Sequence, residues 1–341
     1  MRIVRFRAGG KTRYGVLEGQ HIVEYAGTPY GSFKKGRKKY LLSQAVLLAP
    51  VVPTKIVGVG LNYREHAEEM NVQVPAEPHI FFKPLSALCG PDDPIVFPPQ
   101  SRRVDYEGEL AIVMKKRCHH VAAERAREYV LGYTCLNDVT ARDLHVRDGQ
   151  PTRAKAFDSF CPVGPCIVTD IDPNGVDLET WVNGERRQAS NTKHLLCPVE
   201  DLVARISAIM TLLPGDVIAT GTPGGIGPLQ PGDKVEVRIE SIGGLKNPVI
   251  RIQENHEGAR RPVPPPRAPP PSRWPPAWPS CPRTSSRRST RTSARPAPGA
   301  SISSTWASAI RTCRRPPTSS RRSSAPPRPR RITGIPTTRA S

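Results

Sequence analysis

Short apolar runs separated by turn residues fill the first 250 positions and predict a chain built mainly of β-strands. Residues 1–50 alternate in short apolar and polar steps between glycine-containing turns, which predicts a small N-terminal β subdomain. Beyond it, apolar residues recur in short runs typical of buried or half-buried strands. These runs lie at residues 55–60, 80–84, 95–98, 110–114, 130–136, 163–182 and 235–252.

Helical spacing is confined to a few segments. Residues 62–70 are rich in helix formers and begin at Asn62, a candidate N-cap. Residues 121–131 resemble a short amphipathic helix. Residues 198–212 predict a helix that packs an apolar stripe against the core. That stripe consists of Leu202, Ile206, Ile209 and Met210. The expected fold class is therefore mixed α+β, with strands dominating.

Composition divides the chain near residue 254. Of the 50 basic residues, 18 lie in residues 255–341, all of them Arg, beside a single acid, Glu257. Residues 1–254 keep 32 basic and 29 acidic residues, a net charge of +3. The charge of +20 for the whole chain therefore comes almost entirely from one end, and the charge of the body names no partner.

The last segment, residues 255–341, holds 19 of the 39 prolines and no Lys. Such a composition cannot bury a core and predicts disorder. One interpretation is an Arg-rich arm that binds nucleic acid without sequence specificity. Another is a frameshifted translation of GC-rich DNA, which the absence of Lys favours. We assign this tail no function.

The cysteines and the hydropathy point to a soluble, cytoplasmic protein. None of the six cysteines in residues 1–254 forms a CxxC pair, which leaves zinc-ribbon and thioredoxin-like interpretations without support. Scattered single cysteines suit a reducing cytosol. No apolar run approaches the roughly 18–20 residues of a membrane span, and basic residues interrupt any secretion signal after Met1.

Two glutamates mark the first candidate for chemistry. In Asp105–Met114, Glu107 and Glu109 are two positions apart, so on a strand they share a face about 7 Å apart along it. Beside the apolar run they would repel each other and lose hydration, and a divalent cation would remove both penalties. Oxygen ligands favour Mg²⁺, Mn²⁺ or Ca²⁺ over Zn²⁺. Asp138, at another strand end, is a plausible third carboxylate. The alternative is an exposed strand end carrying two solvated acids.

Other polar residues allow two interpretations each. His66 and Glu69 share one helical face and can pair, as a general base requires, or they form an incidental surface pair. Lys155 lies among small and aromatic neighbours, where it could direct its charge toward an anionic substrate or remain solvated. Arg142, beside Asp143, could cap a helix or form a surface pair.

Residues 214–227 predict a strand that runs into a glycine-rich loop. Such a loop lets backbone N–H groups approach an anion. It has neither the spacing nor the Lys of a phosphate-binding P-loop, so we reject a nucleotide site.

Seven motifs follow one another in order over roughly residues 50–252: GLNYREHAEE, DYEGELAIVM, GYTCLNDVTARD, RAKAFDSFCPVGP, VNGERRQ, PGDVIATGTPGGIG and PGDKVEV. Together they resemble the fumarylacetoacetate hydrolase family, in particular its short bacterial members of the 2-hydroxyhepta-2,4-diene-1,7-dioate isomerase and acylpyruvate hydrolase type. The resemblance implies a β-roll catalytic domain over residues 51–254, after the subdomain at 1–50 and before the disordered tail at 255–341. It also implies a homodimer.

The resemblance also implies the roles of individual residues. It places a Mg²⁺ or Mn²⁺ ion, with Ca²⁺ as a further candidate, on Glu107, Glu109 and Asp138, whereas Asp105 matches the motif without being an ordinary ligand. The catalytic set is His66, Glu69 and Lys155, and the substrate-binding set is Thr222, Arg142 and His145. Relatives often carry Gln where this chain has His145, so the substrate can differ from theirs.

The implied substrate is a 2-oxo acid or 1,3-dicarbonyl intermediate of aromatic catabolism. Our first expectation is a 2-hydroxyhepta-2,4-diene-1,7-dioate isomerase/decarboxylase. The alternative is C–C bond hydrolysis of an acylpyruvate or a fumarylacetoacetate-type substrate. An interpretation of another class, nucleic-acid binding through the basic tail, is favoured less. The sequence does not choose between isomerase and hydrolase.

Overall fold

The computed structural model describes residues 1–252 and shows a mainly β fold with few helices, as the sequence predicts. The predicted tail at residues 255–341, and with it the nucleic-acid interpretation, lies outside the described residues. Within residues 1–252, no helix is long and apolar enough to cross a membrane. The six cysteines of this part are free thiols, and all are buried except the half-buried Cys89.

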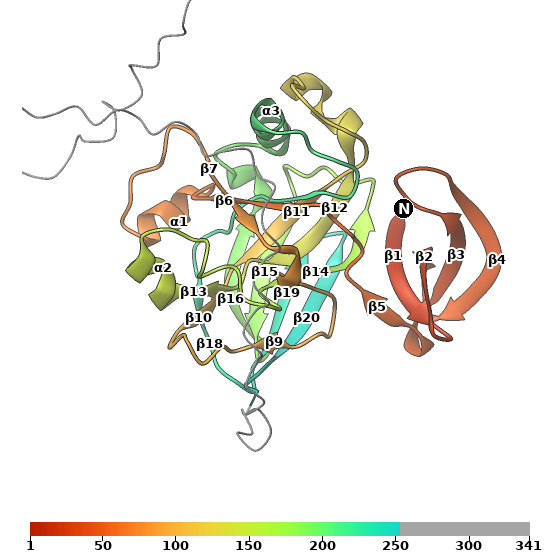
Figure 1. Cartoon of the computed structure of the whole chain (residues 1–341), viewed down its shortest axis with the longest axis horizontal. Helices are drawn as coiled ribbons and strands as arrows, with labels where there is room; N and C mark the ends of the chain where they lie inside the picture. The colour runs from red at the N-terminus through yellow and green to blue at the C-terminus, as the bar shows by residue number, and fades with distance from the viewer. Residues whose placement is uncertain (253–341) are drawn as a thin grey trace, which may run out of the picture. The chain divides into compact units, whose positions relative to one another are not determined.

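The N-terminal strands form an antiparallel meander, shown in red in Figure 1. It consists of β1 (Arg2–Ala8), β2 (Lys11–Glu18), β3 (His21–Gly27) and β4 (Phe33–Leu41), with β5 (Val46–Leu48) paired to β1. On its other side β1 pairs with β14 (Cys161–Val168). The predicted β-rich start of the chain is thus part of the largest sheet, and the domain boundary at residue 50 stays a prediction.

The remainder of this twelve-stranded sheet contains the strands that carry the site. After β14 the order continues with β12 (Val130–Asn137), β11 (Gly108–Met114), β17 (Val217–Ala219), β6 (Ile56–Gly60) and β7 (His79–Lys83). The short strand β8 (Leu88–Cys89) pairs with β14. Strands β11 and β12 are antiparallel, whereas β17 and β6 are parallel neighbours from distant parts of the sequence.

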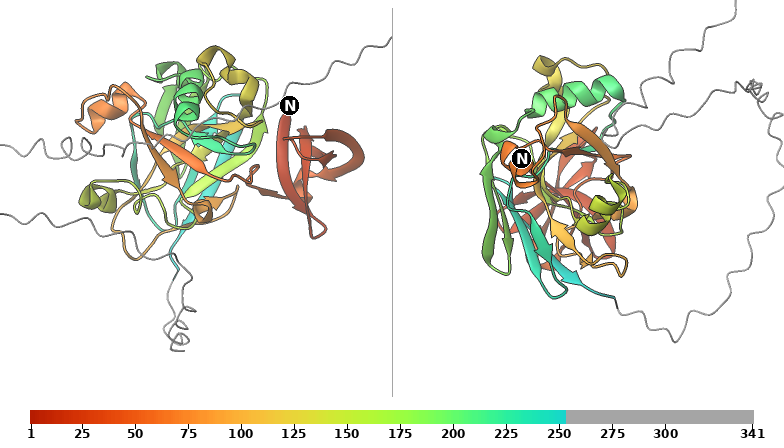
Figure 2. Two further views of the ribbon diagram at one scale, coloured as in Figure 1. Left: turned by 45° about the horizontal axis from the view of Figure 1, so that its top comes forward. Right: turned by 90° about the vertical axis from the view of Figure 1, so that its left-hand side faces the viewer.

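Two smaller sheets complete the β structure. The three-stranded sheet contains β13 (Thr140–Ala141), β10 (Val104–Tyr106) and β18 (Gly227–Leu229). The five-stranded sheet contains β16 (Glu185–Asn191), β15 (Asp177–Val182), β19 (Lys234–Ile239), β20 (Gly243–Ile250) and β9 (Ile95–Val96). Figure 2 shows its longer strands side by side, coloured green to cyan.

The helices are short. They are α1 (Arg64–Glu69), α2 (Arg142–Asp148) and α3 (Val199–Ile209), with 3₁₀ turns η1 (Leu42–Gln44), η2 (Leu85–Ala87), η3 (Ala123–Tyr129) and η4 (Thr192–His194). Helix α3 confirms the expected core-packing helix, and Leu202 and Ile206 are fully buried. Ile209 is 65% exposed, so its place in the predicted stripe is wrong. The reason is that α3 ends there and the chain turns extended at Met210.

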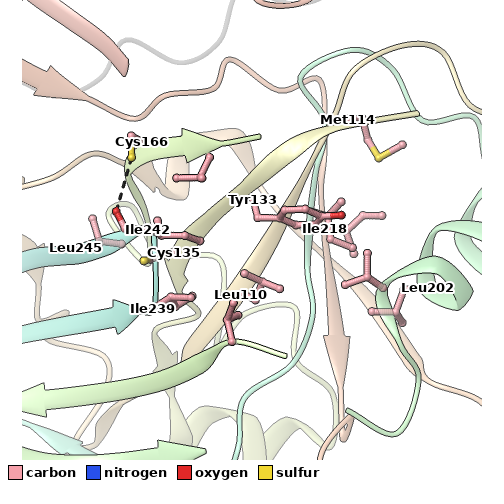
Figure 3. Close-up of a cluster of buried hydrophobic side chains, with 14 of the residues drawn as sticks. Leu110, Met114, Tyr133, Cys135, Cys166, Leu202, Ile218, Ile239, Ile242 and Leu245 are labelled. Atoms are coloured by element: carbon pink, nitrogen blue, oxygen red, sulfur yellow. Dashed lines mark hydrogen bonds between the residues drawn. The ribbon is translucent and has the colours of Figure 1, made fainter. Parts of the chain in front are cut away.

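Strand β11 is buried on both faces, which explains its unbroken apolar run. Its alternate residues enter two separate hydrophobic clusters. Leu110, Ile112 and Met114 join the cluster that includes Leu202 of α3, part of which is drawn in Figure 3. Ala111 and Val113 belong to the other cluster. A strand held between two clusters gives the polar residues at its start a fixed position.

The expected Asn62 cap of α1 is wrong. The helix begins at Arg64, and its N-cap position is Tyr63, without a side-chain hydrogen bond to the helix. Asn62 is instead fully buried and ties two other segments together. Its Nδ2 donates to Cys197 O at 3.1 Å and Thr220 O at 2.8 Å, and its Oδ1 accepts the Cys197 N–H at 2.8 Å. The side chain thereby fixes the loop that follows β6.

We predict that Asn62→Ala lowers the free energy of unfolding by about 2–4 kcal/mol, because three buried backbone groups lose their partner. Asn191 is a matched control, since its side chain also makes three hydrogen bonds, but at the surface. Asn191→Ala should cost no more than about 1 kcal/mol. Denaturant unfolding of the full chain measures both values, and equal losses would contradict the role assigned to Asn62.

Candidate active site

A cavity of about 300 Å³ lies at the start of β11 and the end of β12. Its lining contains every predicted site residue except Glu69, which contacts the lining residue His66. Apolar side chains supply much of the remaining wall. The lining residues are Val59, Gly60, Leu61, His66, Met70, Val72, His79, Phe81, Glu107, Glu109, Asp138, Arg142, His145, Pro151, Lys155 and Thr222.

Strand register brings the three predicted metal ligands together. In the antiparallel pair β11–β12, Gly108 lies opposite Asn137. The next residues outward are Glu107 and Asp138, and the Asp138 N–H donates to Glu107 O at 2.8 Å. Glu109 follows on β11. One carboxylate oxygen from each of Glu107, Glu109 and Asp138 lies within 4.8 Å of the other two.

The structure corrects the local picture of the acidic stretch. Glu107 lies between β10 and β11 and belongs to neither strand, so simple strand alternation does not explain its position. The alternative of two solvated acids is wrong as well. Glu107 is 5% exposed and Glu109 is 1% exposed, since the strands around them cover both.

Lys155 is a buried partner of two of these carboxylates. Its Nζ donates to Glu107 Oε2 at 2.8 Å, to Asp138 Oδ2 at 2.5 Å and to the Thr140 hydroxyl at 2.8 Å. The interpretation of a solvated Lys155 is therefore wrong. Burial opposes its charge, but Asp138 and Glu107 outweigh that effect and raise the pKa of Lys155. The ammonium group stays charged inside the cavity.

Arg142, the first residue of α2, is buried and faces inward. Its Nε donates to Asp105 Oδ2 at 2.9 Å, and its Nη2 donates to Glu107. A surface pair with Asp143 is wrong, because the Asp143 carboxylate accepts the Ser101 hydroxyl at 2.6 Å and the Arg102 N–H at 3.1 Å. Asp105 thus positions Arg142 beside the three carboxylates.

The same environment shifts the pKa values of Glu107 and Glu109 in opposite directions. Burial acts to raise the pKa of Glu107, but the positive charges of Lys155 and Arg142 outweigh it and hold that pKa well below its usual range. Burial and the charge of Asp138 raise the pKa of Glu109 well above its usual range. Glu109 accepts the Gly221 N–H at 2.8 Å, which does not offset these effects.

The three carboxylates fit a divalent cation. Their donors are all oxygens, and separations up to 4.8 Å allow one small ion to contact all three. Mg²⁺ and Mn²⁺ prefer such ligands, and Ca²⁺ accepts them too. An ion here would also favour the ionised form of Glu109, which burial opposes.

His66 and Glu69 form the predicted pair on α1. His66 Nδ1 lies 3.3 Å from Glu69 Oε2; His66 is 7% exposed, whereas Glu69 is exposed, so the pair joins a buried ring to a carboxylate at the surface. Both oxygens of Glu69 also accept the Gly225 N–H at 3.2 Å. Within residues 1–252, the Nε2 atom of His66 makes no hydrogen bond. The ring thus has one nitrogen fixed by Glu69 and the other available at the cavity.

The glycine-rich loop supplies Thr222. Its hydroxyl donates to Gly108 O at 3.0 Å and accepts from Gln188 Nε2 at 2.9 Å. Gln188 Oε1 in turn accepts the Gly108 N–H at 3.0 Å. Sequence reasoning quoted the motif that ends in Gln188 without giving this residue a role. Its full burial could not be read from the polar residues around it.

His145 lies one turn along α2 from Arg142, and its Nδ1 is 3.4 Å from Arg142 Nη1. Burial first, and then the positive charges of Lys155 and Arg142, lower the pKa of His145. The imidazole is thus held neutral near pH 7. The substrate-binding roles of Thr222, Arg142 and His145 stay predictions, as do the catalytic roles of His66, Glu69 and Lys155.

Lys83 is a buried charge that the sequence analysis missed. It ends β7, is 2% exposed, and its Nζ donates to Asp138 Oδ1 at 2.5 Å. A signal was present, because strand alternation puts Lys83 on the same side as His79 and Phe81, which line the cavity. A lysine on the inward side of an apolar strand needs a buried acid.

Comparison with known proteins gives matches over most of the described residues. A model described as the fumarylacetoacetate (FAA) hydrolase C-terminal region matches residues 55–250, and a second, described as Rv2993c-like, N-terminal, matches residues 1–50. A mitochondrial oxaloacetate tautomerase of Rattus norvegicus is 44% identical over 220 residues, 61% of this chain and 70% of that protein.

Solved structures agree with these matches. A 2-hydroxyhepta-2,4-diene-1,7-dioate isomerase from Mycobacterium marinum is 44% identical, with a TM-score of 0.69, over 74% of this chain and 98% of its own. A maleylpyruvate hydrolase from Sphingobium, solved with manganese(II) and pyruvate, is 34% identical, with a TM-score of 0.63. The match covers 74% of this chain and 100% of the hydrolase chain.

We predict that Mn²⁺ or Mg²⁺ binding releases a proton from Glu109. Because its pKa is raised, the carboxyl group holds a proton at pH values where an ordinary Glu is ionised, and a ligand must lose it. Affinity should therefore rise with pH, by up to about tenfold per unit, and level off above the raised pKa. Titration calorimetry in buffers of different ionisation heat counts the protons. A pH-independent affinity with no proton released would contradict this.

Proposed function

The chain belongs to the fumarylacetoacetate hydrolase family, and we propose that it is a divalent-metal-dependent isomerase that moves a proton on a 2-oxo acid. The expected substrate class is that of 2-hydroxyhepta-2,4-diene-1,7-dioate, an intermediate of aromatic catabolism. The observation that carries the proposal is the His66–Glu69 hydrogen bond at the same cavity as three converging carboxylates.

Glu107, Glu109 and Asp138 would hold the ion. When bound, a divalent cation draws electron density from the 2-oxo group of the substrate and makes the neighbouring C–H bond more acidic. Arg142 and Lys155 contribute fixed positive charge beside the carboxylates, which suits an anionic substrate. The apolar wall around Phe81 and Val59 limits the water that reaches this region.

The proton step falls to the pair on α1. On the keto form of a 2-oxo acid, His66 would take a proton from the carbon next to the oxo group through Nε2, while Nδ1 stays hydrogen-bonded to Glu69. On 2-hydroxyhepta-2,4-diene-1,7-dioate it would take the proton of the 2-hydroxyl group instead. Either loss leaves an enolate, because the electron pair of the broken bond is shared between the oxygen and the conjugated carbons. His66 then returns the proton to another atom of the conjugated chain, so the substrate is isomerised with no net gain or loss of protons. Glu69 stabilises the imidazolium in between.

The names of the relatives support proton transfer. The rat protein is named an oxaloacetate tautomerase and the mycobacterial structure an isomerase, at 44% identity each. A second candidate, C–C hydrolysis, is favoured by the 34% identity to a maleylpyruvate hydrolase. There His66 would take its proton from water that attacks a second carbonyl group. Decarboxylation of an oxo acid would use the same cavity. We also propose a homodimer and a cytoplasmic location.

A substrate panel tests the proposal. The full chain, incubated with Mn²⁺ or Mg²⁺, should interconvert the keto and enol forms of oxaloacetate or isomerise 2-hydroxyhepta-2,4-diene-1,7-dioate, followed by ultraviolet absorbance. Acylpyruvates in parallel assays report C–C hydrolysis through formation of pyruvate, and released CO₂ reports decarboxylation. Chelation of the metal should stop each activity. If the chain turns over acylpyruvates and neither of the other substrates, the isomerase proposal is wrong and the hydrolase takes its place.

His66→Ala should lower kcat about 10²-fold or more, because the group that moves the proton is lost. Calorimetry should find Mn²⁺ affinity largely unchanged, since His66 is not one of the three carboxylates. His21→Ala is the control, as His21 is exposed on β3 and absent from the cavity lining. A His66→Ala enzyme with normal kcat and a raised KM would instead assign His66 to substrate binding.

A further inference from the structure

Lys83 is a charged side chain inside the protein for which the proposed reaction has no use. It is the last residue of β7, where it pairs with Ile56 of β6, and its side chain is fully buried. It is absent from the cavity lining, although His79 and Phe81 of the same strand belong to it. Lys83 therefore does not reach the position of a substrate.

The contacts of Lys83 converge on Asp138. Its Nζ donates to Asp138 Oδ1 at 2.5 Å and lies 3.4 Å from Val139 O. The other carboxylate oxygen, Oδ2, accepts from Lys155 at 2.5 Å. Asp138 is 1% exposed. Its two oxygens are held by the ammonium groups of Lys83 and Lys155, which come from different segments.

Stability alone is a poor reason for this arrangement. Taking an ammonium group out of water costs several kcal/mol, and a buried ion pair is often no more stable than apolar residues of the same size. What the pair does supply is orientation, because a hydrogen bond to Oδ1 restrains rotation of the carboxylate about its side-chain bond. The other oxygen, Oδ2, shares the Lys155 ammonium group with Glu107 Oε2, so this orientation places Oδ2 on the side of Glu107.

We propose that Lys83 is a positioning residue for the metal site, which ties Asp138 Oδ1 so that Asp138 presents a single oxygen to the ion. This inference rests on the proposed function only in requiring that the three carboxylates bind a divalent cation. Lys83 acts through Asp138 and has no contact with the substrate.

Because Lys83 is charged, an experiment can distinguish its positioning of Asp138 from its direct electrostatic effect on the bound ion. A positive charge beside a ligand repels a divalent cation, so on charge alone Lys83→Met should bind Mn²⁺ more tightly. Positioning predicts the opposite, because Asp138 gains freedom that must be lost again when the ion binds. Removing groups that orient metal ligands typically costs 10–100-fold in affinity.

The experiment is Mn²⁺ titration calorimetry of the full chain and its variants. Lys83→Met should weaken Mn²⁺ binding about tenfold or more. Lys83→Gln keeps a hydrogen-bond donor without the charge and should lose less Mn²⁺ affinity. The same variant keeps the test possible if Lys83→Met does not fold. The electron paramagnetic resonance spectrum of bound Mn²⁺ should change in Lys83→Met, as one ligand is no longer fixed.

Lys55 offers a matched control. Its Nζ lies 2.5 Å from Oδ2 of the fully buried Asp216, and neither residue lines the cavity. Lys55→Met should lower the melting temperature but leave Mn²⁺ affinity and the Mn²⁺ spectrum within about twofold of wild type. Equal losses of affinity in Lys55→Met and Lys83→Met would overturn the proposal in favour of a general loss of stability.

The remaining outcomes are also decisive. Unchanged or tighter Mn²⁺ binding by Lys83→Met and Lys83→Gln, with a wild-type spectrum, overturns the positioning role while the metal site stands. Failure of the wild-type chain to bind Mn²⁺ overturns the metal-dependent function, and the inference with it. These two failures are told apart by the wild-type titration alone.

Discussion

The structure depends on the burial of opposite charges in one region of the interior. Three buried carboxylates, Asp105, Glu107 and Asp138, pair with the buried cations Lys83, Arg142 and Lys155. Glu109, whose pKa is raised, lies beside them. Each ionic group would be costly alone in the interior, so each needs the others in place. The groups come from β7, from β10, β11 and the residue between them, from the residue after β12, and from α2 and the loop after it. The cluster therefore connects segments that the sequence keeps far apart.

The sheets around this cluster keep it rigid. Strand β11 is packed between two hydrophobic clusters and pairs with β12 on one side and β17 on the other. The backbone of Glu109, near the start of this strand, is therefore held in place. In the loop after β17, the Gly221 N–H donates to Glu109 and the Thr222 hydroxyl donates to Gly108 O. A site built at strand ends, with hydrogen bonds from neighbouring segments, keeps its geometry better than one carried by a free loop.

The acid–base pair is attached in a different way. Helix α1 is short, and Glu69 is connected to the glycine-rich loop through the Gly225 N–H. The proton-transfer groups and the loop that carries Thr222 thus share a contact. In the proposed mechanism the ionic cluster would polarise the substrate and the pair on α1 would move its proton, and both groups of residues meet at one cavity.

The sequence by itself determined the strands, the helix α3, the spacing of His66 and Glu69, and the membership of Glu107, Glu109 and Asp138 in one motif set. The elements follow from local periodicity, whereas the carboxylate set follows from the resemblance of the ordered motifs to the family. Tertiary structure alone decided that Asn62 links three segments rather than capping α1, and that Glu107 lies between two strands. It also decided that Lys83 pairs with Asp138 and that Gln188 donates to Thr222. The physical reason is that burial and pairing partners are set by segments distant in sequence, and no local pattern records them.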